Sequence, residues 1–173
     1  MTGKVLVTGG CGFVGANLVR LLLDKGQEIV VYDNLSKGNR SYLDGLDVEF
    51  IEGDIRDAAT LASAMTSTDR IVHLAAFGSV VESVQDPRTN FEMNVVGTFN
   101  VLEQAVSQDI SKIVFSSTGG ALIGNATPPV NEQSLPKPIS PYGAGKLCCE
   151  AYFHAFSQSY GISTVCTRFA NVY

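Results

Sequence analysis

The sequence contains no tryptophan, only two histidines and only four cysteines among its 173 residues. Cys11, Cys148, Cys149 and Cys166 lack the spacing of a metal site, and two histidines are too few to complete one. We therefore expect no bound metal. In a reducing compartment, such cysteines are expected to be free, small side chains that are buried or half-buried.

Long apolar runs and clusters of basic residues are also missing. No run approaches the roughly twenty residues that span a bilayer, and the N-terminus enters a strand without the charged and apolar regions of a secretory signal. The net charge is −5, and an acidic chain without a basic cluster is poorly suited to bind nucleic acid or an anionic membrane. These absences predict a cytoplasmic protein with neither nucleic acid nor membrane as a partner.

The residues that are present suffice for one core. With 45% apolar and 17% charged residues, the chain is long enough for one globular domain and too short for two full-sized ones. No repeat or linker divides it, so we expect a single domain over residues 1–173.

Strand-like and helical segments alternate along this domain. Apolar runs predict strands at Lys4–Thr8, Glu28–Tyr32, Val48–Glu52, Arg70–Leu74, Lys112–Ser116 and Ser163–Arg168. Helices are expected near Phe13–Lys25, Ala58–Met65, Arg88–Ser107 and Tyr142–Tyr160. This alternation predicts an α/β fold, a doubly wound parallel sheet of the Rossmann type, with helices on both faces in three layers.

Helix starts are well marked. Asp86-Pro87 and Ser140-Pro141 each place a capping side chain before a proline, and Asp57 is expected to cap the second helix. Five of the six prolines fall between Pro128 and Pro141. This segment has little periodicity and is predicted to be a long loop, which is commonly functional.

The glycines after the first strand are the strongest functional signal. Gly9, Gly12 and Gly15 follow a strand and open a helix, the order of a dinucleotide-binding βαβ unit. A diphosphate approaches a helix N-terminus only where side chains are absent and amide N–H groups point outward. Gly9 permits the tight turn, Gly12 admits the phosphates, and Gly15 lets helix and strand pack closely. On their own, three such glycines also fit an ordinary turn.

Asp33 ends the second strand at about the twenty-residue offset that the fingerprint expects. There a carboxylate can accept hydrogen bonds from both ribose hydroxyls of an adenosine and would repel a 2′-phosphate, which favours NAD over NADP. Asp33 can also begin the turn that runs to Gly38, and the two roles are compatible.

Open parallel sheets bind ligands beyond the carboxyl ends of their strands, so the residues there are interpreted as one site. Asp54 could accept a hydrogen bond from an adenine amino group, with Ile55 against the ring, although Asp54 also fits a simple turn. Ala75 and Ala76 are small enough to let a cofactor pass, and equally ordinary in a packed turn. The residues expected to bind the cofactor in this way are Gly9, Gly12, Phe13, Val14, Gly15, Asp33, Asn34, Leu35, Ser36, Gly38, Asp54, Ile55, Leu74, Ala75, Ala76 and Ser116.

The catalytic candidates are Tyr142 and Lys146, whose spacing puts phenol and ammonium on one helix face. Making a phenol of pKa about 10 a base near pH 7 requires about 4 kcal/mol, and a nearby ammonium acts in that direction. Tyr142 would then exchange a proton with a substrate hydroxyl, and Thr118 would hydrogen-bond the same oxygen. Alone, the pair also fits a surface tyrosine packed along a lysine stem, and Ser116-Ser117-Thr118 a strand-end turn. Gly143 and Gly145, costly in a helix, suggest close approach of ligand or backbone.

Together these motifs resemble the extended short-chain dehydrogenase/reductase family. The likeness is strongest to its NAD-dependent sugar-nucleotide epimerases and dehydratases, foremost those that interconvert UDP-glucose and UDP-galactose at C4. It covers essentially the whole chain through the motifs Val7–Gly15, Tyr32–Leu35, Gly53–Asp57, His73–Ala76, Asp86-Pro87, Asn94–Thr98, Ser116–Thr118, Tyr142–Lys146 and Arg168–Tyr173.

The resemblance implies an NAD-dependent isomerase that transiently oxidises the sugar at C4 and returns hydride to the other face. It implies Tyr142, Lys146 and Thr118 as catalytic residues, with Tyr142 and Lys146 also contacting NAD. By the same resemblance Asn94 lies near the nicotinamide, and Asn171 joins Thr118 and Tyr142 in contacting the UDP-sugar. It further implies a homodimer through the two long helices, which apolar Phe153 and Phe156 support weakly from the sequence.

The chain departs from the family in length and in detail. Family members are about twice as long and add a C-terminal substrate-binding domain, which we expect to be absent here. A second hypothesis is therefore a nucleotide-binding module that holds NAD without turnover. A third is another reaction on a sugar nucleotide, dehydration or reduction; Gly119-Gly120 in place of an acid pair disfavours dehydration. Ser117 remains an alternative to Thr118 as the hydroxyl partner.

Overall fold

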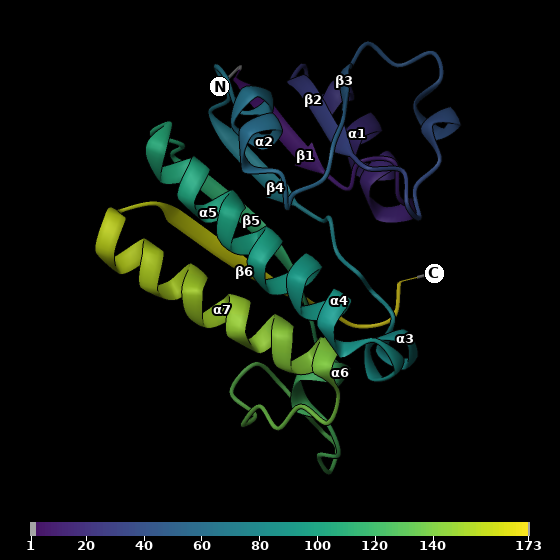
Figure 1. Cartoon of the computed structure of the whole chain (residues 1–173), viewed down its shortest axis with the longest axis vertical. Helices are drawn as coiled ribbons and strands as arrows, with labels where there is room; N and C mark the ends of the chain where they lie inside the picture. The colour runs from purple at the N-terminus through teal and green to yellow at the C-terminus, as the bar shows by residue number, and fades with distance from the viewer. Residues whose placement is uncertain (1–2, 173) are drawn as a thin grey trace.

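The computed structural model describes residues 3–172 and shows a six-stranded, wholly parallel sheet (Figure 1). The strands are β1 (Lys4–Thr8), β2 (Glu28–Asp33), β3 (Glu49–Glu52), β4 (Arg70–His73), β5 (Lys112–Thr118) and β6 (Ser163–Phe169). Their order in the sheet is β3-β2-β1-β4-β5-β6. Because β2 and β4 flank β1, the chain reverses direction across the sheet there, as a doubly wound fold requires. The predicted fold class is confirmed.

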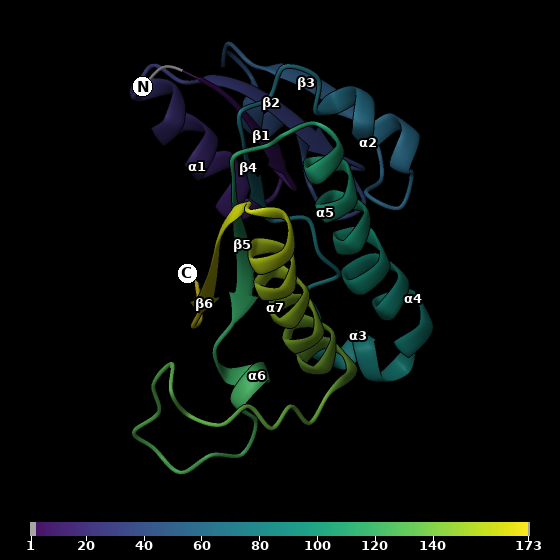
Figure 2. The ribbon, with the colours of Figure 1, turned by 90° about the vertical axis from the view of Figure 1, so that its left-hand side faces the viewer.

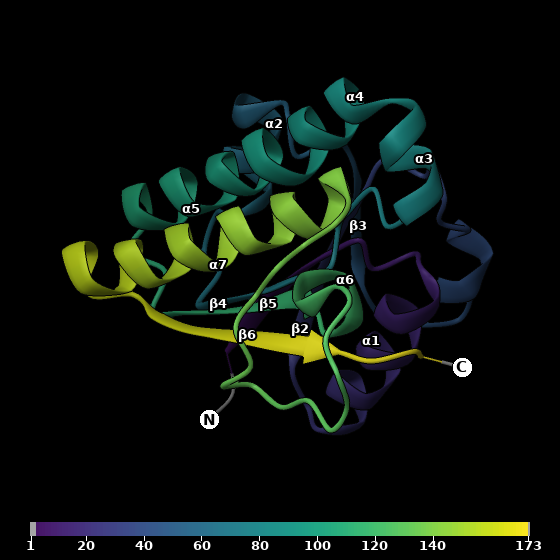
Figure 3. The same ribbon diagram turned by 90° about the horizontal axis from the view of Figure 1, so that it is seen from below.

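Helices pack on the two faces of this sheet. They are α1 (Phe13–Asp24), α2 (Ala58–Ala64), α3 (Val80–Gln85), α4 (Pro87–Phe91), α5 (Gly97–Ser107), α6 (Gly120–Ile123) and α7 (Pro141–Tyr160). Figure 3 shows α2, α5 and α7 on one side of the sheet and α1 on the other, and Figure 2 shows α5 and α7 running side by side. The long helices thus lie together on one face.

Alternating strand residues build a core on each face. On the face of α5 and α7, Leu6, Ile113 and Phe115 belong to the larger buried cluster. On the face of α1, Val5 and Val7 pack with Ala16 and Val19 in a smaller one. The middle positions of the strands therefore contribute to one core or the other, which explains why β1, β4 and β5 are apolar through their middle residues.

The sheet face that carries α1 is only partly covered in the described residues. Val114 pairs in register with Val165, and Val165 is 47% exposed. The predicted helices are present on both faces, and within the described residues the β5–β6 edge is uncovered on the face that carries α1. The reason is that α7 crosses on the other face, so the crossover between β5 and β6 leaves this one open.

The predicted caps are confirmed, but the helix pattern is more broken than expected. Asp57, Asp86 and Ser140 each accept a hydrogen bond from a backbone N–H in the first turn of their helix. The expected helix Arg88–Ser107 starts one residue earlier and contains a π-helical turn at Glu92–Val96 between α4 and α5. Three short helical segments were not expected: α3, α6 and the 3-10 turn Arg40–Leu43.

Candidate functional site

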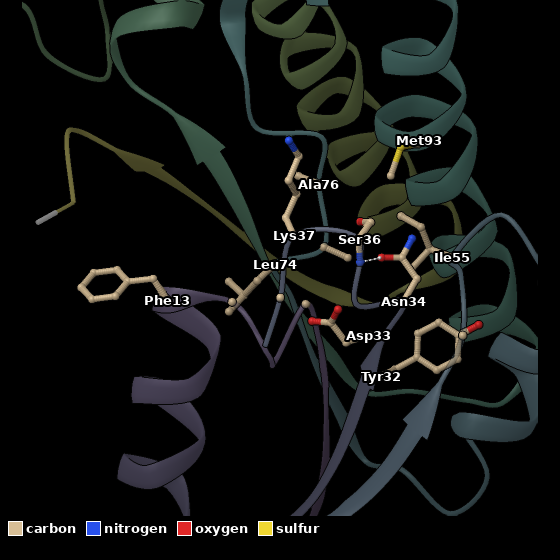
Figure 4. Close-up of a pocket in the computed structure, with 15 residues that line it drawn as sticks. Phe13, Tyr32, Asp33, Asn34, Ser36, Lys37, Ile55, Leu74, Ala76 and Met93 are labelled. Carbon is tan, nitrogen blue, oxygen red and sulfur yellow. Dashed lines mark hydrogen bonds between the residues drawn. The ribbon is translucent and has the colours of Figure 1, made fainter. Parts of the chain in front are cut away.

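A cavity of about 250 Å³ lies at the carboxyl ends of β1, β2 and β4 (Figure 4). It is lined by Gly9, Gly12, Phe13, Tyr32, Asp33, Asn34, Ser36, Lys37, Gly38, Gly53, Ile55, Leu74, Ala75, Ala76 and Met93. Segments far apart in the sequence meet here because the parallel strands all end at this edge, at the point where the strand order reverses.

The glycine turn is built as the sequence predicts. Gly9 has a φ of +73°, which side-chain-bearing residues rarely adopt, and a Cβ there would lie 2.6 Å from the backbone nitrogen of Ala75. A Cβ at Gly15 would overlap the carbonyl of Gly9 and lie 2.7 Å from Cα of Gly10. The start of α1 therefore packs directly against the turn, and the amide groups at its N-terminus stay uncovered by side chains.

Asp33 is buried and ties this turn to the segment that follows β2. Its Oδ2 accepts a hydrogen bond of 2.9 Å from the N–H of Cys11, and its Oδ1 accepts one of 2.8 Å from the N–H of Leu35. Each carboxylate oxygen keeps a further lone pair that can face the cavity. Asp33 thus begins the turn and remains available as an acceptor, so the two predicted roles are compatible.

The next strand end is held by a polar network around Asp54. Its carboxylate accepts hydrogen bonds from Arg56 and from the side chain of Asn34, 2.9 Å away. The side-chain hydrogen bond from Arg56 is the main cause that lowers the pKa of Asp54 well below its usual range. The hydroxyl of Tyr32 donates to the backbone oxygen of Asp54 over 2.8 Å. Asp54 therefore shapes the loop, and its contact with an adenine stays a prediction.

The segment after β4 is fixed by two buried asparagines. Asn94 accepts from the N–H of Phe77 at 2.8 Å and donates to its carbonyl oxygen at 3.1 Å. Asn90 donates to the same oxygen at 3.2 Å. The side chain of Asn94 thus positions the loop that holds Ala75 and Ala76. Its location near a nicotinamide ring stays a prediction.

Lys146 is buried beneath the start of α7. Its ammonium donates to the backbone oxygen of Ser116 over 2.8 Å and lies 4.5 Å from the ring centroid of Phe115. Burial lowers the pKa of Lys146 to about 8, so the group is charged at neutral pH. An ammonium in this setting is held firmly at the end of β5.

Tyr142 lies one helical turn before Lys146 and is half-buried. The ammonium of Lys146 is 5.9 Å from the centroid of the Tyr142 ring. Burial raises the pKa of Tyr142, the opposite of what a base requires, so the expected lowering of this pKa by Lys146 is not seen at this distance.

The two candidate hydroxyl residues at the end of β5 point to different faces of the sheet. Ser117 points to the same face as Phe115 and is buried, whereas Thr118 points to the opposite face.

The predicted site residues separate into two groups. Most expected cofactor contacts line the cavity, whereas its lining does not include Val14, Gly15, Leu35, Asp54, Asn94 and Ser116. The predicted catalytic residues Thr118, Tyr142 and Lys146 are outside the lining too. Asn171 is exposed in the segment after β6, and Tyr173, the last residue of the family motif, lies outside the described residues.

Four lining residues were missed: Tyr32, Lys37, Gly53 and Met93. Tyr32 and Gly53 had a signal, because they directly precede Asp33 and Asp54. Lys37 stands between two predicted contacts, Ser36 and Gly38, in a turn whose sequence gives it no separate signal. Met93 comes from the π-helical turn, which no sequence pattern marked.

The described residues contain no group of three or more histidine, cysteine, aspartate or glutamate side chains placed to hold a metal ion. None of the helices in residues 3–172 combines the length and apolarity that crossing a membrane demands. All four cysteines are free and are buried or half-buried as expected.

Three features define a dinucleotide-binding protein of the Rossmann class. They are a glycine turn at a helix N-terminus, an aspartate at the end of the second strand and a cavity at the point where the strand order reverses. Residues 5–173 match the NAD dependent epimerase/dehydratase family, and the chain belongs to this family.

Its relatives include UDP-glucose 4-epimerases. The one from Halalkalibacterium halodurans is 41% identical over 169 residues, which are 96% of this chain and 50% of that protein. The crystal structure of the Thermus thermophilus UDP-glucose 4-epimerase in complex with NAD superposes with a TM-score of 0.95 at 40% identity, covering 98% of this chain and 56% of that one. For the Thermotoga maritima enzyme with UDP-glucose the TM-score is 0.94 at 37% identity, again covering 98% and 56%. The chain spans about half the length of these proteins.

Proposed function

We propose that the chain binds NAD across the carboxyl ends of β1, β2 and β4 and forms the cofactor-binding portion of a UDP-sugar 4-epimerase, with UDP-glucose and UDP-galactose as substrates. The observation that carries this proposal is the buried Lys146, whose ammonium is fixed 2.8 Å from the carbonyl of Ser116 at the same sheet edge as the glycine turn. A buried lysine with a lowered pKa, one helical turn from a phenol, is typical of a catalytic group. The relatives bound to NAD and to UDP-glucose support both ligands.

The site fits a dinucleotide. Glycines form the turn where a diphosphate would approach the N-terminus of α1, and a Cβ at Gly9 or Gly15 would collide with backbone. Asp33 offers acceptor oxygens at the end of β2 for ribose hydroxyls. The small side chains of Ala75 and Ala76 leave room along the path to β4.

Within this proposal, each catalytic residue has a separate task. NAD, when bound, would supply the hydride acceptor. Tyr142 would take the proton of the sugar C4 hydroxyl and later return it. Lys146, charged below pH 8, would favour the phenolate, and Thr118 or Ser117 would hydrogen-bond the sugar oxygen. Asn171 would contact the UDP-sugar.

A second candidate function is NAD binding without turnover. It is favoured by the cavity, whose lining contains the adenosine-side residues and none of Thr118, Tyr142 and Lys146. In this alternative, residues 1–173 act as an NAD-binding domain.

Two measurements test the proposal. Mass spectrometry of nucleotide released by denaturation should detect NAD. Addition of UDP-glucose to the NAD-loaded chain should then produce the absorbance of reduced nicotinamide in a single turnover. NAD without reduction would favour the binding module, and the absence of both would contradict the proposal.

We also infer a cytoplasmic homodimer. The argument from Phe153 and Phe156 is wrong, because both are buried in the core of their own chain. An apolar groove between α4 and α7, lined in part by Phe91, Val95 and Cys148, supports the helix-mediated contact instead. Sedimentation velocity should give a dimer, and a monomer at micromolar concentration would contradict it.

A further inference from the structure

Lys37 is the one cavity-lining residue with a positive charge. Of the described residues that line the cavity, only Asp33 and Lys37 are charged. Figure 4 shows the two side chains pointing apart: Asp33 lies beside the glycine turn, and the ammonium of Lys37 extends toward the segment that contains Ala76. Lys37 therefore leaves its own loop and reaches across the cleft.

The partner of Lys37 lies on the far side. Its Nζ is 3.3 Å from Oε1 of Glu82, in the first turn of α3. Lys37 follows β2 and Glu82 follows β4, and these strands flank β1, which ends in the glycine turn. The ion pair therefore joins the two walls on either side of the turn, across the path along which a dinucleotide's diphosphate would run.

A bound diphosphate and the carboxylate of Asp33 would together place several negative charges in the cleft, which a nearby cation would stabilise. A diphosphate brings two negative charges to a chain whose net charge is −5, next to the carboxylate of Asp33. The N-terminus of α1 has no acidic residue in its first turn and supplies only about half a positive charge. A lysine on a flexible four-carbon stem is suited to complete the neutralisation.

We propose that Lys37 binds the diphosphate of the dinucleotide and that Glu82 holds its ammonium across the cleft until the ligand takes its place. This rests on the proposed NAD-binding function and adds a residue to it. The exchange costs little, because the two side chains are 69% and 42% exposed and solvent-exposed ion pairs are weak. Glu82 competes with the diphosphate for the same ammonium.

Calorimetric titration of the intact chain with adenosine, ADP and 2′-AMP tests the proposal. Lys37→Met should weaken ADP binding by about tenfold, as loss of one charge-assisted contact does, and leave adenosine binding within about twofold. Glu82→Gln should strengthen ADP binding by about two- to fivefold, because the competing carboxylate is gone. Lys112→Met, an exposed lysine at the opposite end of β5, is the matched control and should change neither.

Three outcomes would overturn it. An equal loss of adenosine and ADP binding in Lys37→Met would show that Lys37 only stabilises the structure of the site. A loss confined to 2′-AMP would assign it to a phosphate on the ribose. A loss of ADP binding in Glu82→Gln would show that the ion pair stabilises the site instead of competing with the ligand. If the unmodified chain binds none of the three probes and no NAD, the proposed function itself fails.

Discussion

Tyr142 and Lys146 show how the surroundings of a residue set its chemistry. They have the helical spacing expected of a phenol and ammonium pair, yet burial raises the pKa of Tyr142 and lowers the pKa of Lys146 to about 8. Both shifts favour the neutral forms, because desolvation disfavours charge. With a pKa of about 8, Lys146 retains its charge at neutral pH, and its ammonium donates to the carbonyl of Ser116.

Under the proposed mechanism, Tyr142→Phe should leave NAD binding intact and remove the proton transfer. We expect NAD affinity within about twofold of the unmodified chain and a loss of about 10²–10⁴-fold in nicotinamide reduction by UDP-glucose. Calorimetry and single-turnover absorbance measure the two quantities. Tyr152→Phe, on the exposed side of the same helix, is the control. Equal loss of binding and reduction in Tyr142→Phe would mean that the phenol is structural.

His73 makes stability depend on pH. Its ring is buried between the hydroxyls of Thr8 and Thr98, with Nδ1 2.6 Å from one and Nε2 2.9 Å from the other. Burial, with a smaller effect of Lys146, lowers the pKa of His73 to about 3. The unfolded chain binds a proton near pH 6.5 and the folded chain does not, so stability is full above pH 6.5 and declines as the pH falls toward 3.

Urea unfolding should therefore show a loss of about 2 kcal/mol between pH 7 and pH 5. His73→Gln should remove most of this slope, whereas His154→Gln, at an exposed position of α7, should keep it. An unchanged slope in His73→Gln would place the pH dependence elsewhere.

At the scale of elements, α7 contains two glycines with different surroundings. A Cβ at Gly143 would overlap the backbone oxygen of Ala121 and lie 3.0 Å from Cβ of Pro138. At Gly145 the nearest atom would be Cγ2 of Val95, at the ordinary distance of 3.4 Å. The expected close approach is thus present at Gly143, where it is made by backbone.

Gly143→Ala should lower the free energy of unfolding by about 1–3 kcal/mol, because α6 must move away. Gly145→Ala should be neutral or raise it by up to about 1 kcal/mol through helix propensity. Urea unfolding of both variants at pH 7 compares them within one helix. Similar values for the two would show that the contact with Ala121 does not constrain α7.

Elements with strong local signals were predictable from the sequence, and those made by tertiary contacts were not. The strands, the capped helices and the turn at Gly9 follow from apolar runs, capping residues and glycine spacing. Helix α3 is only six residues long, too short for a periodic pattern. The π-helical turn that brings Met93 to the cavity depends on packing around Asn94, which no local spacing encodes.

The same limit applies to the site. Asp33 could be located because strand, turn and acid follow in a fixed order. Lys37 could not be located in this way, because its proposed role depends on Glu82, which lies on another element. The two residues meet only in the folded chain, where Nζ of Lys37 is 3.3 Å from Oε1 of Glu82. The engagement of Asp54 by Arg56 and Asn34 also becomes visible only once the loops are folded together.

At the scale of the whole molecule, the sheet collects the ends of β1, β2 and β4 into one cleft and places the buried Lys146 at the end of β5 along the same edge. The face of β5 and β6 opposite α7 stays partly exposed, with Val165 at its surface. The cleft and the proposed catalytic pair, Tyr142 and Lys146, are thus adjacent parts of one edge.

Calorimetric titration of the chain with NAD and with NADP measures most directly whether a dinucleotide binds along this edge with its adenosine at Asp33. NAD should bind at one site per chain, and NADP should bind at least about tenfold more weakly because Asp33 repels a 2′-phosphate. Absence of NAD binding, or equal affinity for the two, would contradict the assignment of the cleft.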